Sequence, residues 1–162
     1  MNLVKWNKLY KNNMRLDKIF VDKYKDDKRL YDKNIVELMV EISEFVNETK
    51  VFKYWTTKKP KQEKMLEEYA DVITMILTFY SIYKLKIKEY YPNIEETDIL
   101  KLIMELYQKV YKFYEHNNKE ILEEIFYYTI YIGTLLEFTE SDVIEAIDKK
   151  QKIIEERLNS DY

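Results

Sequence analysis

The chain has 162 residues, of which 27 are lysine or arginine and 30 are aspartate or glutamate, and its formal net charge is −3 at pH 7. A slightly negative net charge does not indicate a protein that binds nucleic acid or an anionic membrane, since such proteins usually carry an excess of positive charge. The absence of cysteine excludes disulfides, thiolate metal sites and a cysteine nucleophile, and the length predicts a single domain over residues 1–162.

Residues that form turns are scarce in the chain, with one glycine and two prolines. This composition argues against a β fold with many turns. Apolar residues recur instead with the helical period, so we predict an all-α fold, a bundle of five or six helices. In chain order, helices are expected over residues 3–24, 35–50, 62–90, 97–114 (with Thr97 as the N-cap), 119–136 and 142–158.

The residues between these segments predict where the helices begin and end. A polar break precedes the second helix, and Asp32 or Asn34 is expected to cap it. Because proline disfavours the helical conformation in the residue before it, Tyr91-Pro92-Asn93 is expected to end the third helix. Either Thr139 or Ser141 is expected to cap the last helix.

Two segments bear on the location of the protein. Residues 1–34 are rich in lysine, aspartate and asparagine and lack the apolar core of a signal peptide. The low-charge stretch over residues 125–136 is too short to span a bilayer, so we expect a buried helix there. Its aromatic residues also offer apolar surface to a partner subunit, although core packing explains them equally well. We therefore expect a cytoplasmic protein that does not enter membranes.

A first pair of carboxylates lies on the helix expected over residues 35–50. Glu41 and Glu44 are three residues apart, a spacing that places both side chains on one face of a helix. Glu37 and Glu48 extend the same acidic stripe, opposite apolar positions such as Phe45. For a stripe of this kind taken alone, a solvated face of an amphipathic helix is the more common explanation.

A second pair of carboxylates enters a far more apolar helix. Glu68 and Asp71 precede residues 72–83, which contain no charge. Buried carboxylates without partners are costly and require protons or cations to offset them. Two pairs on consecutive helices would gather four carboxylates, namely Glu41, Glu44, Glu68 and Asp71. All-oxygen ligation suits a hard cation, so we predict a Mg²⁺ site at these four residues.

The segments that carry these acids resemble a known protein family. Residues 40–50, followed by Phe52-Lys53-Tyr54-Trp55, look like the first metal motif of the dimeric, all-α dUTP diphosphatases. Leu66-Glu67-Glu68-Tyr69-Ala70-Asp71 resembles their second metal motif. Looser similarities to the uracil-reading helix and the C-terminal motif of that family occur at Asn13-x-x-Leu16-Asp17, residues 133–139 and 144–146, Lys150, Arg157 and Tyr162.

This resemblance implies a Mg²⁺-dependent hydrolase that converts dUTP to dUMP and pyrophosphate. It also implies a homodimer encoded by a bacterium or a phage. The four acids would hold the metal ions, and Glu44 would also orient or deprotonate the attacking water. The resemblance further implies a set of substrate contacts, which would place Asn13 and Asp17 near uracil, Trp55 near the nucleoside, and Lys150 and Arg157 on the phosphates.

Several positions depart from the pattern of that family. A glutamine is usual at the uracil position, where this chain has Asn13, and two asparagines are common where it has Gln151 and Ile154. The metal motifs therefore match the family, whereas the base and ribose-phosphate contacts look altered. An all-α nucleoside triphosphate pyrophosphohydrolase of the MazG type, with a different base preference, is accordingly the nearest alternative.

Two further classes of protein share parts of this pattern. A di-iron bundle also pairs acids across helices, but it typically uses Glu-x-x-His motifs from two helices. The only histidine of this chain, His116, does not have that spacing. A catalytically weak relative would instead use the fold to bind a regulatory protein partner, and it would bind nucleotide without turning it over.

Overall fold

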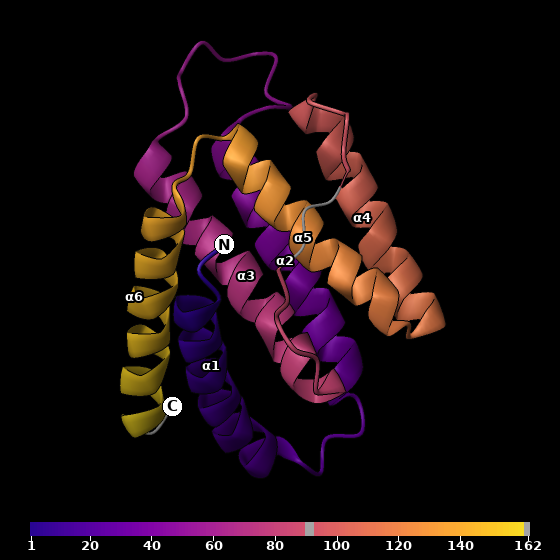
Figure 1. Cartoon of the computed structure of the whole chain (residues 1–162), viewed down its shortest axis with the longest axis vertical. Coiled ribbons are helices and arrows are strands. Elements are labelled where there is room, and N and C mark those ends of the chain that lie inside the picture. Colours follow the sequence, from indigo (N-terminus) through magenta and orange to yellow (C-terminus); the bar gives the residue numbers. More distant parts are fainter. Residues whose placement is uncertain (90–92, 161–162) are drawn as a thin grey trace.

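A computed structural model describes residues 1–89 and 93–160, and within these residues the chain forms six helices and no strand (Figure 1). The all-α prediction is therefore confirmed. In chain order the helices are α1 (Leu3–Tyr24), α2 (Leu30–Thr49), α3 (Gln62–Tyr83), α4 (Ile99–His116), α5 (Lys119–Leu135) and α6 (Glu140–Asn159).

Helix α3 is the centre of the bundle. It packs against α1, α2, α5 and α6, whereas α4 packs on α5 and α2. Figure 1 shows α1 and α6 on one side of α3, and α4 and α5 on the other. The apolar character of α3 explains its position, because its buried side chains include Val72, Ile73, Ile76, Leu77, Phe79 and Tyr80. A carboxylate on α3 is therefore held close to side chains of neighbouring helices.

The single glycine of the chain, Gly133 on α5, lies against the side chain of Tyr69 on α3. A Cβ atom at Gly133 would be 2.5 Å from the hydroxyl oxygen of Tyr69, which is closer than two such atoms can pack. Tyr69 is buried, and its hydroxyl donates a hydrogen bond of 3.0 Å to the carbonyl of Thr129 on α5. The glycine thus leaves room for the Tyr69 ring, whose residue directly follows Glu68 on α3.

Helix α1 has the predicted bounds, but the predicted N-cap of α2 is wrong. Helix α2 begins after Arg29, so neither Asp32 nor Asn34 caps it. The acid that organises this helix start is Asp27, which lies ahead of the helix. Its carboxylate accepts hydrogen bonds from the backbone N–H of Arg29 at 2.9 Å and from the ammonium of Lys33 at 2.5 Å.

The caps of the last three helices are side chains that accept backbone N–H groups. Asp98 caps α4 in place of the predicted Thr97, because its carboxylate accepts from the first turn of the helix. Thr139, one of the two residues predicted for this position, caps α6 and forms a capping box with Asp142, so Ser141 is not the cap. Asn118 caps α5 in the same way.

Helix α3 ends earlier than the predicted residue 90. Lys84 adopts a left-handed conformation with φ of 54°, and its backbone N–H bonds to the carbonyls of Tyr80 and Ser81. This closure of the last turn stops the helix at Tyr83, and residues 84–89 are not helical. Tyr91 and Pro92, which belong to the predicted break, lie outside the described residues.

The aromatic stretch over residues 125–136 belongs to the core of the chain. Ile125, Phe126, Tyr128 and Ile132 are buried inside the bundle, so they are not free to receive a partner subunit. Exposed apolar side chains lie instead on α1, on the segment between α2 and α3, and on α4 together with the neighbouring face of α2. Within the described ranges 1–89 and 93–160, each helix is too short or too polar to span a bilayer.

Candidate metal centre

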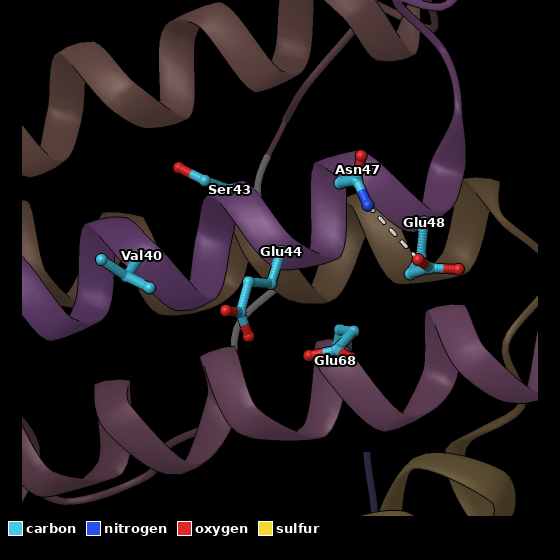
Figure 2. A pocket seen from close by; sticks show the side chains of 6 residues that line it. All are labelled: Val40, Ser43, Glu44, Asn47, Glu48 and Glu68. Carbon is cyan, nitrogen blue, oxygen red and sulfur yellow. Dashed lines mark hydrogen bonds between the residues drawn. The ribbon is translucent and has the colours of Figure 1, made fainter.

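Three glutamates from two packed helices converge at one point of the bundle. Glu41 and Glu44 lie one turn apart on α2, and Glu68 lies on α3. Each offers a carboxylate oxygen, and these oxygens all lie within 4.8 Å of one another. Figure 2 shows Glu44 directed from α2 toward Glu68 on α3. This arrangement arises because α2 and α3 pack side by side, which turns the acid-bearing edges of both helices to the same groove.

Asp71 lies one turn beyond Glu68, on the buried side of α3. It is only 8% exposed, and one of its oxygens forms an ion pair with the ammonium of Lys150 on α6. Its other oxygen, Oδ1, is buried and has no hydrogen-bond partner among the described residues. Oε2 of Glu41 is in the same condition. Buried carboxylate oxygens without donors are unfavourable, so each of these atoms requires a proton or a cation to offset it.

The carboxylates of this cluster interact electrostatically. Burial, helped by the negative charge of Asp71, raises the pKa of Glu41 to about 7. Burial also raises the pKa of Glu68, and the charges of Asp71 and Glu44 add to the shift. The pKa of Asp71 is raised by burial as well, although its hydrogen bond with Lys150 opposes that shift. The ammonium of Lys150 alone therefore does not offset these carboxylates, which hold their protons to higher pH than free carboxyl groups do.

An open cleft adjoins the cluster. It has a volume of about 490 Å³, and Figure 2 shows the side chains that line it, namely Val40, Ser43, Glu44, Asn47, Glu48 and Glu68. Within the cleft, the amide of Asn47 donates a hydrogen bond of 3.3 Å to Glu48. The hydroxyl of Ser43 lies 2.8 Å from that of Tyr107 on α4. Our sequence analysis did not single out Ser43 and Asn47, although their spacing of four residues places them on one face of α2, beside the acidic stripe.

The donor set fits a hard divalent cation. All four predicted ligands are carboxylates, which are the oxygen ligands that Mg²⁺ prefers in proteins. Three of them, Glu41, Glu44 and Glu68, already have oxygens close to one another. The negative charge of the fourth, Asp71, acts on Glu41 and Glu68 and raises their pKa values. The unpartnered buried oxygens of Glu41 and Asp71 are consistent with a site whose final ligand is an ion.

The residues predicted to contact the nucleoside and the phosphates lie at different places on the molecule. Trp55 belongs to the segment between α2 and α3, where its ring is 64% exposed and makes an edge contact with the ring of Tyr54 at 5.1 Å. Lys150 points into the acidic cluster, as its ion pair with Asp71 requires. Arg157 is exposed on the last turn of α6, about 10 Å further along the helix than Lys150. Tyr162 lies outside the described residues.

Asn13 and Asp17 lie in a buried polar network between α1, α3 and α6. Asn13 is 2% exposed, and its amide donates to Asp17 at 3.0 Å and to Thr78 at 3.2 Å. Its amide oxygen accepts a hydrogen bond of 3.2 Å from Gln151. Burial raises the pKa of Asp17 to about 6, against the lowering effect of its hydrogen bonds with Thr78 and Asn13. Every polar atom of the Asn13 side chain is thus engaged within the chain.

The fold and the site together define a class of protein. They describe an all-α bundle in which acids from two packed helices border an open cleft, an arrangement suited to binding cations and phosphate groups. More particularly, a family model described as dUTPase matches residues 5–162, and the chain belongs to this family of dimeric, all-α dUTPases. It is a hydrolase that converts dUTP to dUMP and pyrophosphate. No curated protein matches the chain.

Proposed function

We propose that this dUTPase depends on Mg²⁺ held by Glu41, Glu44, Glu68 and Asp71, and that it acts in the cytoplasm. The observation that supports the metal site best is the convergence of three carboxylate oxygens within 4.8 Å beside a cleft. Bound Mg²⁺ would bind phosphate oxygens, offset negative charge and lower the pKa of a coordinated water. The reaction consumes one water and breaks one phosphoanhydride bond, so no covalent nucleophile from the protein is needed.

Glu44 is the proposed base. It lies on the exposed side of the cluster and lines the cleft, where a water and a triphosphate can both reach it. In this role its carboxylate orients the attacking water and accepts the proton that the water loses, while pyrophosphate leaves. Glu41 and Asp71 are more deeply placed, so we assign them to holding the ions rather than to proton transfer.

The remaining predicted residues are proposed to bind the nucleotide. Trp55 presents an exposed indole ring that a nucleobase or sugar can cover. Lys150 and Arg157 supply positive charge for the phosphates. Base recognition by Asn13 and Asp17 requires part of their hydrogen-bond network with Thr78 and Gln151 to open, because their polar atoms are already engaged.

Release of pyrophosphate from a panel of deoxynucleoside triphosphates tests this function. We expect dUTP to be cleaved fastest, with activity lost in EDTA and restored by Mg²⁺. Faster cleavage of dCTP or another nucleotide would indicate a MazG-type enzyme, in line with the departures at Asn13, Gln151 and Ile154. Binding of dUTP with Mg²⁺ but without turnover would indicate a regulator that acts on a protein partner.

We further propose that the enzyme is a homodimer that uses the outer faces of α4 and α2. Four large side chains are exposed along α4, namely Leu100, Met104, Tyr111 and Tyr114. Together with Tyr107 they follow a spacing of four and three residues, which is the seam pattern of helices that pair with other helices. Val36 and Val40 are exposed on the neighbouring α2, and Val40 also lines the cleft. A second copy seated there would border the active site.

Substitution of Met104 by glutamate tests this interface. We expect the parent chain to elute as a dimer in size-exclusion chromatography with light scattering, and Met104→Glu to shift it toward the monomer, because a buried charge opposes association. Val4→Glu is the matched control, since Val4 is 81% exposed on α1 and lies outside the proposed seam. A monomeric parent, or the same shift in both variants, would contradict the interface.

A further inference from the structure

The ammonium of Lys150 lies beside the acidic cluster and interacts with several of its carboxylates. It forms an ion pair with Asp71, in which the Asp71 side chain is 11% exposed and the Lys150 side chain 25% exposed. Its positive charge also acts on Glu41, Glu68 and Glu37, where it opposes the upward pKa shifts caused by burial. Of the seven ion pairs found among the described residues, this one has the most buried carboxylate, so little solvent screens it.

The position of Lys150 is fixed by the residue that follows it. Gln151 is fully buried, and its amide donates to the carbonyl of Leu9 at 3.0 Å and to the side chain of Asn13 at 3.2 Å. Its amide oxygen accepts a hydrogen bond of 2.8 Å from Asn12. Three hydrogen bonds therefore clamp this turn of α6 to α1. The clamp sets the rotation of α6 about its axis, and with it the direction in which Lys150 leaves the helix.

We propose that Lys150 is an internal counter-ion that competes with the divalent cation for the carboxylate cluster. This inference rests on the proposed metal site. An ammonium bonded to Asp71 supplies part of the positive charge that the cluster needs, so it reduces the charge available to attract an ion. It also repels a divalent cation bound a few ångströms away, and the low exposure of the pair strengthens that repulsion.

A consequence follows for the order of events at the site. A phosphate group that draws Lys150 away from Asp71 frees a carboxylate for the cation. A cation that occupies the cluster in turn weakens the hold of Asp71 on Lys150. Binding of the nucleotide and binding of the cation therefore favour each other, because linkage between two ligands is reciprocal. Lys150 thereby keeps the affinity of the free enzyme for metal low until a triphosphate arrives.

Direct measurement of metal binding tests the proposal. The probe is Mn²⁺ alone, without nucleotide, followed through the electron paramagnetic resonance signal of the free ion. We expect Lys150→Met and Lys150→Gln to bind Mn²⁺ on the order of tenfold more tightly than the parent, because the competing charge is gone. Lys150→Arg, which keeps the charge, should bind close to the parent. In the same uncharged variants kcat should fall. A substitution that merely damaged the site would instead lower both kcat and the affinity for Mn²⁺.

Lys152→Met is the matched control. Lys152 lies on the same helix and pairs with Asp148, but both side chains of that pair are largely exposed, so its removal should leave Mn²⁺ affinity unchanged. Affinity in folded Lys150→Met or Lys150→Gln that is equal to or lower than that of the parent would overturn the proposal. If neither variant folds without metal, folding restored by Mn²⁺ would support it, and failure to fold in saturating Mn²⁺ would overturn it. A parent chain that does not bind Mn²⁺ saturably would instead refute the metal site itself.

Discussion

Replacement of Glu44 or Glu68 by glutamine should lower kcat/KM for dUTP by about a thousandfold or more, with the fold retained. Glutamine keeps the size of the side chain but removes the negative charge and the ability to accept a proton. Glu44 loses its proposed role as base, and Glu68 loses its contribution to the cluster of three oxygens that lie within 4.8 Å of one another. The measurement is pyrophosphate release with Mg²⁺, together with circular dichroism for helix content.

Glu67→Gln is the control for both substitutions. Glu67 precedes Glu68 on α3 and is exposed, and it contributes no oxygen to the cluster, although its charge acts on Glu68 and Asp71. The variant therefore has the same change in charge without the loss of a ligand, and it should keep most of the parental activity. Mn²⁺ binding separates the two roles, because Glu68→Gln should weaken it more than Glu44→Gln if Glu44 acts mainly on water. Turnover that stays at the parental level in Glu44→Gln or Glu68→Gln would remove that residue from the mechanism.

The parts of the site that the sequence predicts are those that depend on local geometry. The three-residue spacing within each acid pair fixes both side chains on one helix face, and the uncharged stretch after Asp71 indicates that α3 is buried. Consecutive helices usually pack as neighbours, as α2 and α3 do across residues 50–61, so these facts favour convergence of Glu41, Glu44 and Glu68. Local signals of the same kind give the bounds of α1 and limit the cap of α6 to Thr139 or Ser141, of which Thr139 is the cap.

The contacts that the sequence does not reveal join segments far apart in the chain. Lys150 reaches Asp71 across 79 positions, and Gln151 reaches Asn13 across 138. Both contacts depend on the rotation of α6 about its axis and on its crossing of α1 and α3, which are set by packing rather than by local preference. For this reason our sequence analysis assigned Lys150 to the phosphates only and did not anticipate that Asn13 would be buried.

The effect of pH on the metal-free protein follows from the raised pKa of Glu41. In the unfolded chain a glutamate loses its proton near pH 4.3, whereas in the folded chain burial holds the pKa of Glu41 at about 7. Between these values the unfolded state gives up the proton first, so the free energy of unfolding falls as pH rises from about 4.3 to 7 and then levels off. Because solvent still reaches Glu41, we take the loss as about 1–2 kcal/mol. Asp17, with its pKa raised to about 6, acts in the same direction.

Glu41→Gln should therefore be more stable than the parent in EDTA at pH 7.5, by about 1–2 kcal/mol or roughly 4 °C in Tm, and equal to it near pH 4. An amide at this position is attracted to the charge of Asp71 instead of being repelled by it. Saturating Mg²⁺ should reverse the order at pH 7.5, because ions at a hundred times Kd stabilise a folded site by about 2.7 kcal/mol and the variant has lost one ligand. Thermal melts at both pH values, with and without Mg²⁺, provide the measurement.

Asp17→Asn is the comparison, since its effect on Tm should not depend on Mg²⁺. A parent chain whose Tm in EDTA exceeds that of Glu41→Gln at pH 7.5 would mean that burial of the charged Glu41 carboxylate beside Asp71 does not destabilise the metal-free fold.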